Sequence, residues 1–85
     1  MLKLQFFTDP GHGWIKVKKT DLVKLGIADK ISPYSYMRTD FAYLEEDCDA
    51  SLYLGALKQR GIEFQLLNLP SSGNSRVRSY QRYVA

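Results

Sequence analysis

The stretch from Asp9 to Trp14 constrains the fold of this chain more than any other feature. It holds the only histidine and the only tryptophan among 85 residues, with one of three prolines and two of six glycines. Residues 2–6 and 14–18, on either side, alternate apolar and polar side chains, which is typical of strands with one buried face. Because the connection is short, we predict an antiparallel hairpin in which Trp14 points away from Ile15 and Val17.

A second hairpin is predicted for residues 34–38 and 41–45, about Thr39 and Asp40. A tight turn would pair Tyr36 with Tyr43 and would sort the side chains onto two faces of the sheet. One face would carry Met37, Ala42 and Leu44. The other would carry Tyr34, Tyr36, Arg38, Phe41 and Tyr43.

Two helices and a further strand complete the predicted domain. Thr20 suits the N-cap of a short helix that ends at Gly26, and Gly61 suits the C-cap of a longer one that follows the acidic residues 45–49. In the longer helix, one face carries Ala50, Tyr53, Leu54 and Leu57. Residues 62–69 are predicted to be a strand whose inward side chains are Ile62, Phe64 and Leu66.

The element order is therefore β-β-α-β-β-α-β. This order predicts a small α+β domain over residues 1–70, with a mainly antiparallel sheet and its helices on one face. Residues 71–85 begin with a Ser- and Gly-rich stretch and are expected to form a flexible basic C-terminal tail.

The net charge of +3 comes entirely from that tail. Residues 1–70 contain nine basic and nine acidic side chains, so the excess is Arg76, Arg78 and Arg82. Concentrated positive charge serves nucleic-acid binding, because each neutralised phosphate releases counterions. A basic, Ser-rich chain end that is merely solvated is the alternative interpretation.

Composition also bounds the location of the protein. Its single cysteine, Cys48, cannot form an internal disulfide, which agrees with a reducing compartment. No run of apolar residues is long enough to span a bilayer, and the N-terminus lacks the order of a signal peptide. We therefore expect a cytoplasmic protein with no membrane association.

Candidate catalytic chemistry is sparse. His12 between two glycines could present an imidazole beside free backbone N–H groups, but a tight turn in which His12 caps a carbonyl explains the same residues. Cys48 and His12 have the residue types of a nucleophile and a base. However, the acidic neighbours of Cys48 should raise its pKa, and a buried or half-buried structural thiol is favoured. An enzyme is therefore the less favoured interpretation.

No metal and no cofactor are predicted. The acidic residues 45–49 lack the spacing of a calcium loop, because Ser51 and Tyr53 occupy positions where ligands would be needed, and helix capping explains the same carboxylates. With one histidine and one cysteine in the chain, the sequence has no zinc motif.

The aromatic and basic face of the sheet is the strongest candidate for binding. Aromatic side chains interleaved with basic ones can stack single-stranded nucleic acid, and exposed aromatic side chains also form hot spots for proteins. Alternatively, Val77, Tyr80 and Tyr83 of the tail, or a second subunit in a homodimer, cover this face. The predicted partner-binding residues are His12, Trp14, Tyr34, Tyr36, Arg38, Tyr43, Arg76, Arg78 and Arg82.

Four pieces of the sequence are familiar in combination. They are residues 9–17, residues 25–36 (Leu-Gly-Ile-Ala-Asp-Lys-Ile-Ser-Pro-Tyr-Ser-Tyr), residues 43–49 (Tyr-Leu-Glu-Glu-Asp-Cys-Asp) and the closing Arg-Ser-Tyr of residues 78–80. In this order they resemble a family of small uncharacterised proteins encoded by bacteriophages, plasmids and other bacterial mobile elements. The resemblance covers nearly the whole chain. It implies a bacterial cytoplasm and brings no catalytic residue or cofactor with it.

The resemblance and the binding face together lead to one functional hypothesis. The protein is expected to be a non-enzymatic accessory protein that binds a host protein or ribonucleoprotein stoichiometrically, for example as an anti-CRISPR or other anti-defence inhibitor. The alternative is a nucleic-acid-binding module that uses the aromatic face and the arginines of the tail. The identity of the partner and the oligomeric state do not follow from the sequence.

Overall fold

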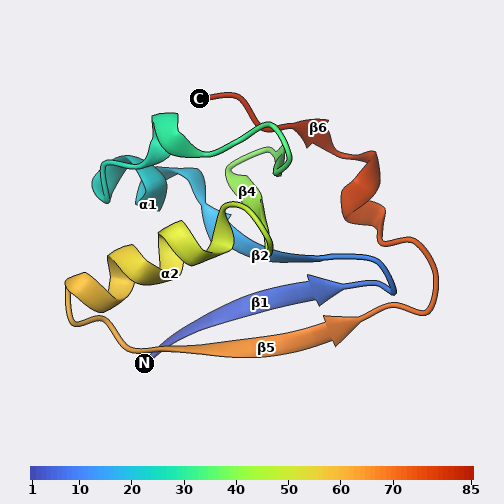
Figure 1. Cartoon of the computed structure of the whole chain (residues 1–85), viewed down its shortest axis with the longest axis horizontal. Helices are drawn as coiled ribbons and strands as arrows, with labels where there is room; N and C mark the ends of the chain where they lie inside the picture. Colours follow the sequence, from blue (N-terminus) through green and yellow to red (C-terminus); the bar gives the residue numbers. More distant parts are fainter.

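In the computed structural model, which describes residues 1–85, six strands form one sheet in the order β5-β1-β2-β4-β3-β6 (Figure 1). The strands are β1 (Leu2–Thr8), β2 (Gly13–Lys18), β3 (Tyr36–Arg38), β4 (Phe41–Glu45), β5 (Phe64–Pro70) and β6 (Gln81–Arg82). All neighbouring strands are antiparallel except β1 and β5, which run parallel. With helices α1 (Lys19–Lys24) and α2 (Ala50–Gln59), this arrangement confirms the predicted α+β class.

Both predicted hairpins are present with the predicted sorting of side chains. In the first, Phe7 lies opposite Trp14, so Trp14 and Ile15 point to different faces. In the second, Tyr36 lies opposite Tyr43, which is the pairing expected for a tight turn. Thr39 has a φ of 52°, a left-handed conformation that is uncommon for a β-branched residue.

Both helices end at the predicted glycines, but α1 does not have the predicted N-cap. Gly26 and Gly61 have φ values of 73° and 69°, as expected for left-handed residues that end α1 and α2. The helix α1, however, begins at Lys19, and Thr20 does not cap it. The N-cap position is Lys18, the last residue of β2, and a lysine side chain has no acceptor with which to cap the helix.

The two faces of the sheet carry two separate hydrophobic clusters. On one face, α1 and α2 cover the sheet through Leu22, Tyr53 and Leu57, which pack with Ile15 and other residues of the main core. On the opposite face, Trp14, Tyr36, Tyr43 and Val77 form a second cluster. We call this second group the aromatic cluster. The helices thus lie on one face, as predicted, while the C-terminal segment covers the other.

The C-terminal segment differs from the expected flexible tail. It contains a short 3-10 helix, η2 (Arg76–Ser79), and β6, which pairs with β3 at the edge of the sheet. Val77 is 1% exposed and Tyr83 is 5% exposed, and the Tyr83 hydroxyl donates a hydrogen bond of 2.6 Å to the carbonyl of Ala28. Composition suggested a linker because it counts serines and arginines. The apolar side chains between them nevertheless have burial sites in the domain.

The strand β5 also differs from its prediction. Ile62 lies before the strand, and Leu66, which was expected to be buried, is 38% exposed. Only Phe64 of the three predicted inward residues packs against the main core. The reason is that β5 is an edge strand beside β1, so one side of it has no neighbouring strand (Figure 1).

None of the helices is long and apolar enough to cross a membrane.

Candidate functional site

A pocket of about 380 Å³ opens where the β1–β2 loop, the end of β4 and the C-terminal segment meet. Its lining residues come from sequence positions as far apart as His12 and Arg82. They combine aromatic, acidic and basic side chains: His12, Trp14, Tyr34, Tyr36, Glu45, Asp47, Cys48, Arg78 and Arg82.

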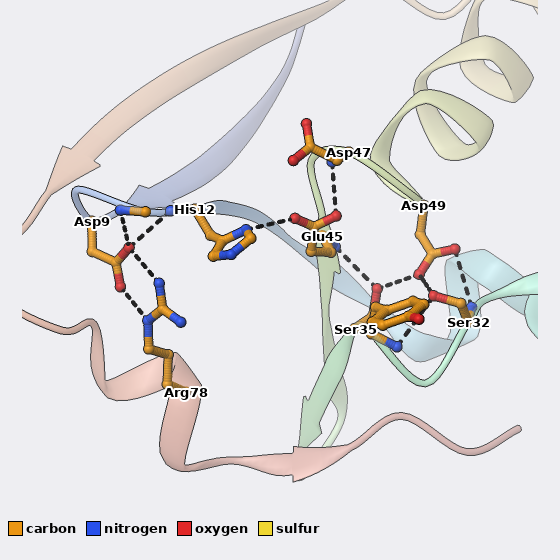
Figure 2. Close-up of polar contacts among 10 residues, drawn as sticks. Asp9, His12, Ser32, Ser35, Glu45, Asp47, Asp49 and Arg78 are labelled. Atoms are coloured by element: carbon orange, nitrogen blue, oxygen red, sulfur yellow. Dashed lines mark hydrogen bonds and ion pairs between the residues drawn. The ribbon is translucent and has the colours of Figure 1, made fainter.

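Asp9 holds the β1–β2 loop in the shape that forms one wall of the pocket. Its carboxylate accepts hydrogen bonds from the backbone N–H groups of Gly11 and His12, at 3.0 and 2.9 Å. The same carboxylate accepts two bonds from the Arg78 guanidinium, at 2.6 and 2.9 Å (Figure 2). It also accepts one from the N–H of Ser75. Asp9 therefore joins the loop to the C-terminal segment.

These contacts explain a shift in the acidity of Asp9. The Arg78 guanidinium, followed by the Ser75 N–H, holds the pKa of the Asp9 carboxyl well below its usual range. They also decide between the two alternatives for the loop. In one of the two alternatives for this loop its N–H groups would be free to bind an anion, but those of Gly11 and His12 are already bonded to Asp9.

His12 pairs with a buried carboxylate at the end of β4. Its Nδ1 lies 3.0 Å from Oε1 of Glu45, whose side chain is 8% exposed, whereas the imidazole is 45% exposed. Oε2 of Glu45 accepts a hydrogen bond of 2.8 Å from the backbone N–H of Asp47 (Figure 2). His12 was expected to cap a backbone carbonyl, and this expectation is wrong. The sheet brings Glu45 beside it, because Glu45 pairs with Trp14 in the register of β2 and β4.

A second buried carboxylate fixes the backbone behind Glu45. Asp49 is 4% exposed and accepts hydrogen bonds from the N–H and hydroxyl of Ser32 and from the hydroxyl of Ser35. The Ser35 hydroxyl oxygen in turn accepts a bond of 3.0 Å from the N–H of Glu45. The sequence suggested that Asp49 stabilises the start of α2, yet it makes no side-chain cap there. Its bonds instead connect the segment before β3 to the end of β4.

The aromatic wall of the pocket is covered by arginines. The guanidinium carbon of Arg82 lies 4.7 Å from the ring centre of Tyr36, and that of Arg78 lies 5.3 Å from the ring centre of Trp14. These are cation–π distances. Trp14 Nε1 is a buried donor with no hydrogen-bond partner, the only such buried side-chain atom in the protein.

Cys48 lines the pocket and is exposed, so the expectation of a buried or half-buried thiol is wrong. The expected direction of its acidity is confirmed. Desolvation raises the pKa of the thiol, and the neighbouring carboxylates of Glu45, Asp49 and Asp47 raise it further. The surroundings of Cys48 therefore disfavour the thiolate form that a nucleophile requires.

The structure brings some of the predicted binding residues together and separates others. Five of them line the pocket with His12: Trp14, Tyr34, Tyr36, Arg78 and Arg82. Among these, Trp14 and Tyr36 are buried, while Tyr34 is 65% exposed. Three lie outside the pocket. Tyr43 is buried with its ring centre 5.0 Å from that of Tyr80, Arg38 lies over Tyr80, and Arg76 is exposed.

Of the three alternatives for the aromatic face, the structure therefore favours cover by the tail. Val77 and Tyr80 pack on this face, but Tyr83 does not, because it joins the main core on the other side. The stacking surface expected for nucleic acid is accordingly not open. Asp9 and Glu45 were not predicted as site residues. An aspartate before Pro-Gly is a turn-forming signal that could have indicated Asp9, whereas the role of Glu45 depends on the neighbouring strand.

Comparison with protein-family models, curated proteins and solved structures found no match to this chain. The chemistry of the site is therefore argued from its geometry. An imidazole oriented by a carboxylate is the arrangement of a general base. Here the pKa of the neighbouring thiol is raised by desolvation and by the carboxylate of Glu45, so the thiol is not activated by His12. The arrangement is better suited to binding a ligand than to activating a nucleophile.

Proposed function

We propose that the protein is a non-enzymatic binding protein whose partner inserts a side chain or chain end into the pocket beside His12. The observation that carries this proposal is the pocket itself, in which an exposed aromatic ring, an exposed guanidinium and the His12–Glu45 pair converge. Tyr34 and Arg82 are the accessible members of this set. Tyrosine and arginine are the residue types most enriched in protein-binding hot spots.

A protein partner is favoured over nucleic acid by the burial of the aromatic cluster. Single-strand binding needs several exposed rings for successive bases, and here Trp14, Tyr36 and Tyr43 are buried. One of the three tail arginines also has an intramolecular anionic partner, since Arg78 binds Asp9. Less of the tail charge is therefore available for phosphates than the sequence suggested.

The resemblance of residues 9–17, 25–36, 43–49 and 78–80 to mobile-element proteins supports the biological setting. In this proposal the chain acts in a bacterial cytoplasm, as a phage or mobile-element accessory protein. It binds a host protein or ribonucleoprotein stoichiometrically, for example to inhibit a defence system.

The test uses quantitative capture from a bacterial lysate followed by affinity measurement with the captured protein. Tyr34→Ala should weaken binding about thirtyfold, because a hot-spot ring contributes about 2 kcal/mol or more. Val23→Ala is the control, because Val23 is 68% exposed on α1, outside the pocket. Arg82→Ala should weaken binding while Arg60→Ala, at the end of α2, should not.

Equal affinity for all four variants and the unsubstituted protein would overturn the proposal. A second measurement addresses nucleic acid directly. Binding to a single-stranded oligonucleotide that falls steeply between about 50 and 200 mM salt, with no protein captured after nuclease treatment, would instead support the nucleic-acid-binding module.

A further inference from the structure

The carboxylates at the end of β4 lack cationic partners. Residues 45–49 include Glu45, Glu46, Asp47 and Asp49, and the only basic side chain within ion-pair distance of any of them is His12. Glu45 is 6% exposed, and a buried carboxylate is costly unless it is paired with a cation or coordinates a metal. The acidic side of the pocket therefore favours a bound cation.

The three side chains nearest one another have metal-ligand geometry. One ligand atom each from His12, Glu45 and Asp47 lies within 4.8 Å of the others, and the His12–Glu45 distance is 3.0 Å. Two ligands of a tetrahedral zinc ion, each about 2.1 Å from the metal, are about 3.4 Å apart. Asp47 is exposed, so a rotation of its side chain can close the remaining gap.

The surroundings of these ligands resemble the outer shell of a metal site. The backbone of His12 is fixed by Asp9, and Glu45 is oriented by the N–H of Asp47 and held from behind by Ser35. Such hydrogen bonds hold the ligand side chains in position before the metal binds. Figure 2 shows the Glu45 carboxylate between the His12 ring and the Asp47 backbone.

A further observation points to a ligand in the same place. Trp14 lines the pocket with His12, Glu45 and Asp47, is 2% exposed, and its Nε1–H has no acceptor. A buried donor is normally hydrogen-bonded, and the protein itself supplies no acceptor for this one. Because Nε1 has almost no accessible surface, a metal-bound water or anionic group in the pocket reaches it only when the indole or the Arg78 side chain over it shifts. Arg78 and Arg82, which also line the pocket, would favour an anionic group there.

We propose that His12, Glu45 and Asp47 form a three-ligand site for a divalent transition-metal ion, with Zn²⁺ as the preferred ion and an open coordination position facing the pocket. One imidazole nitrogen and two carboxylates suit zinc, whereas an all-oxygen set would suit magnesium or calcium. Three protein ligands with one open position are characteristic of sites that bind an exogenous group. This inference goes beyond the proposed binding function and does not depend on it.

The test is calorimetric titration of Zn²⁺ alone into the metal-free protein, with Co²⁺ absorption as a second readout. One equivalent should bind, with tetrahedral Co²⁺ bands that lack thiolate charge transfer. His12→Ala and Asp47→Asn should each weaken Zn²⁺ binding at least tenfold. Asp40→Asn, in the exposed β3–β4 turn, should bind as tightly as the unsubstituted protein, and so should Cys48→Ser, because the thiol is not among the three ligands.

The proposal is overturned if the unsubstituted protein shows no saturable binding, or if His12→Ala and Asp47→Asn bind Zn²⁺ normally. Loss of binding in Cys48→Ser, with thiolate charge transfer to Co²⁺, would also overturn the ligand assignment. Circular dichroism of each variant guards against unfolding, and both substituted ligand residues are exposed. Partner capture repeated with a chelator separates the two proposals, since metal binding can fail while capture persists.

Discussion

The docking of the C-terminal segment leads to a quantitative prediction for Val77→Ala. Val77 is 1% exposed and packs with Trp14, Tyr36 and Tyr43, so its two γ-methyl groups are removed from water. At about 0.8 kcal/mol for each buried carbon, the transfer free energy lost is about 1.6 kcal/mol. The cavity left behind adds on the order of 1 kcal/mol. We expect the free energy of unfolding to fall by about 2 to 3 kcal/mol.

Urea denaturation followed by circular dichroism measures this change directly. Thermal melts give a second measure. For a domain of this size, the melting temperature should fall by about 8 to 24 °C, at about 4 to 8 °C for each kcal/mol. Val84→Ala is a matched control, because it is the same substitution in the same segment at a residue that is 61% exposed. Its effect should stay within about 0.5 kcal/mol.

The outcome that refutes the reasoning is equal stability of the two variants. In that case Val77 would contribute no buried surface, and residues 71–85 would form the flexible tail that the sequence suggested. The aromatic cluster would then be exposed, and the argument against nucleic-acid stacking would be lost. A large effect of Val77→Ala beside a small effect of Val84→Ala would establish the segment as part of the domain.

Three further predictions concern the loop and the longer helix. Gly13→Ala should destabilise the protein by about 1 to 3 kcal/mol in thermal melts, because a Cβ there would lie 2.7 Å from the Phe6 ring. Gly55→Ala should instead raise stability by about 0.5 to 1 kcal/mol, because this helical site has open space around it. Asp9→Asn removes the carboxylate that Arg78 stabilises. Because the pKa of Asp9 is lowered on folding, its contribution is complete above about pH 4 and declines at lower pH, so the stability gap to the unsubstituted protein should narrow in acid.

Much of the fold could be predicted because its signals are local. The alternation of residues 2–6 and 14–18 determined the first hairpin, and the second hairpin has the predicted pairing of Tyr36 with Tyr43. Gly26 and Gly61 end their helices in the left-handed conformation, as expected for residues without a Cβ. These features depend on neighbours a few residues apart, and the sequence reports such neighbours directly.

The predictions that were wrong concern features that depend on contacts between residues far apart in the sequence. Nothing near Leu66 indicates that β5 is an edge strand. The Ser- and Arg-rich composition around Val77 could not decide between a flexible tail and a segment that covers the aromatic face. Thr20 was expected to cap α1, but the helix begins one residue earlier, directly after the end of β2, so Thr20 lies inside it.

The pocket shows the same division. Sequence alone determined that His12 lies in a tight loop between two strands, because glycine, proline and alternating side chains permit little else. Only the tertiary structure decided the partners of this loop. The register of β2 and β4 places Glu45 beside His12, and the C-terminal segment brings Arg78 to Asp9. These pairs join residues 33 and 69 positions apart, so they follow from strand order and packing rather than from any local pattern.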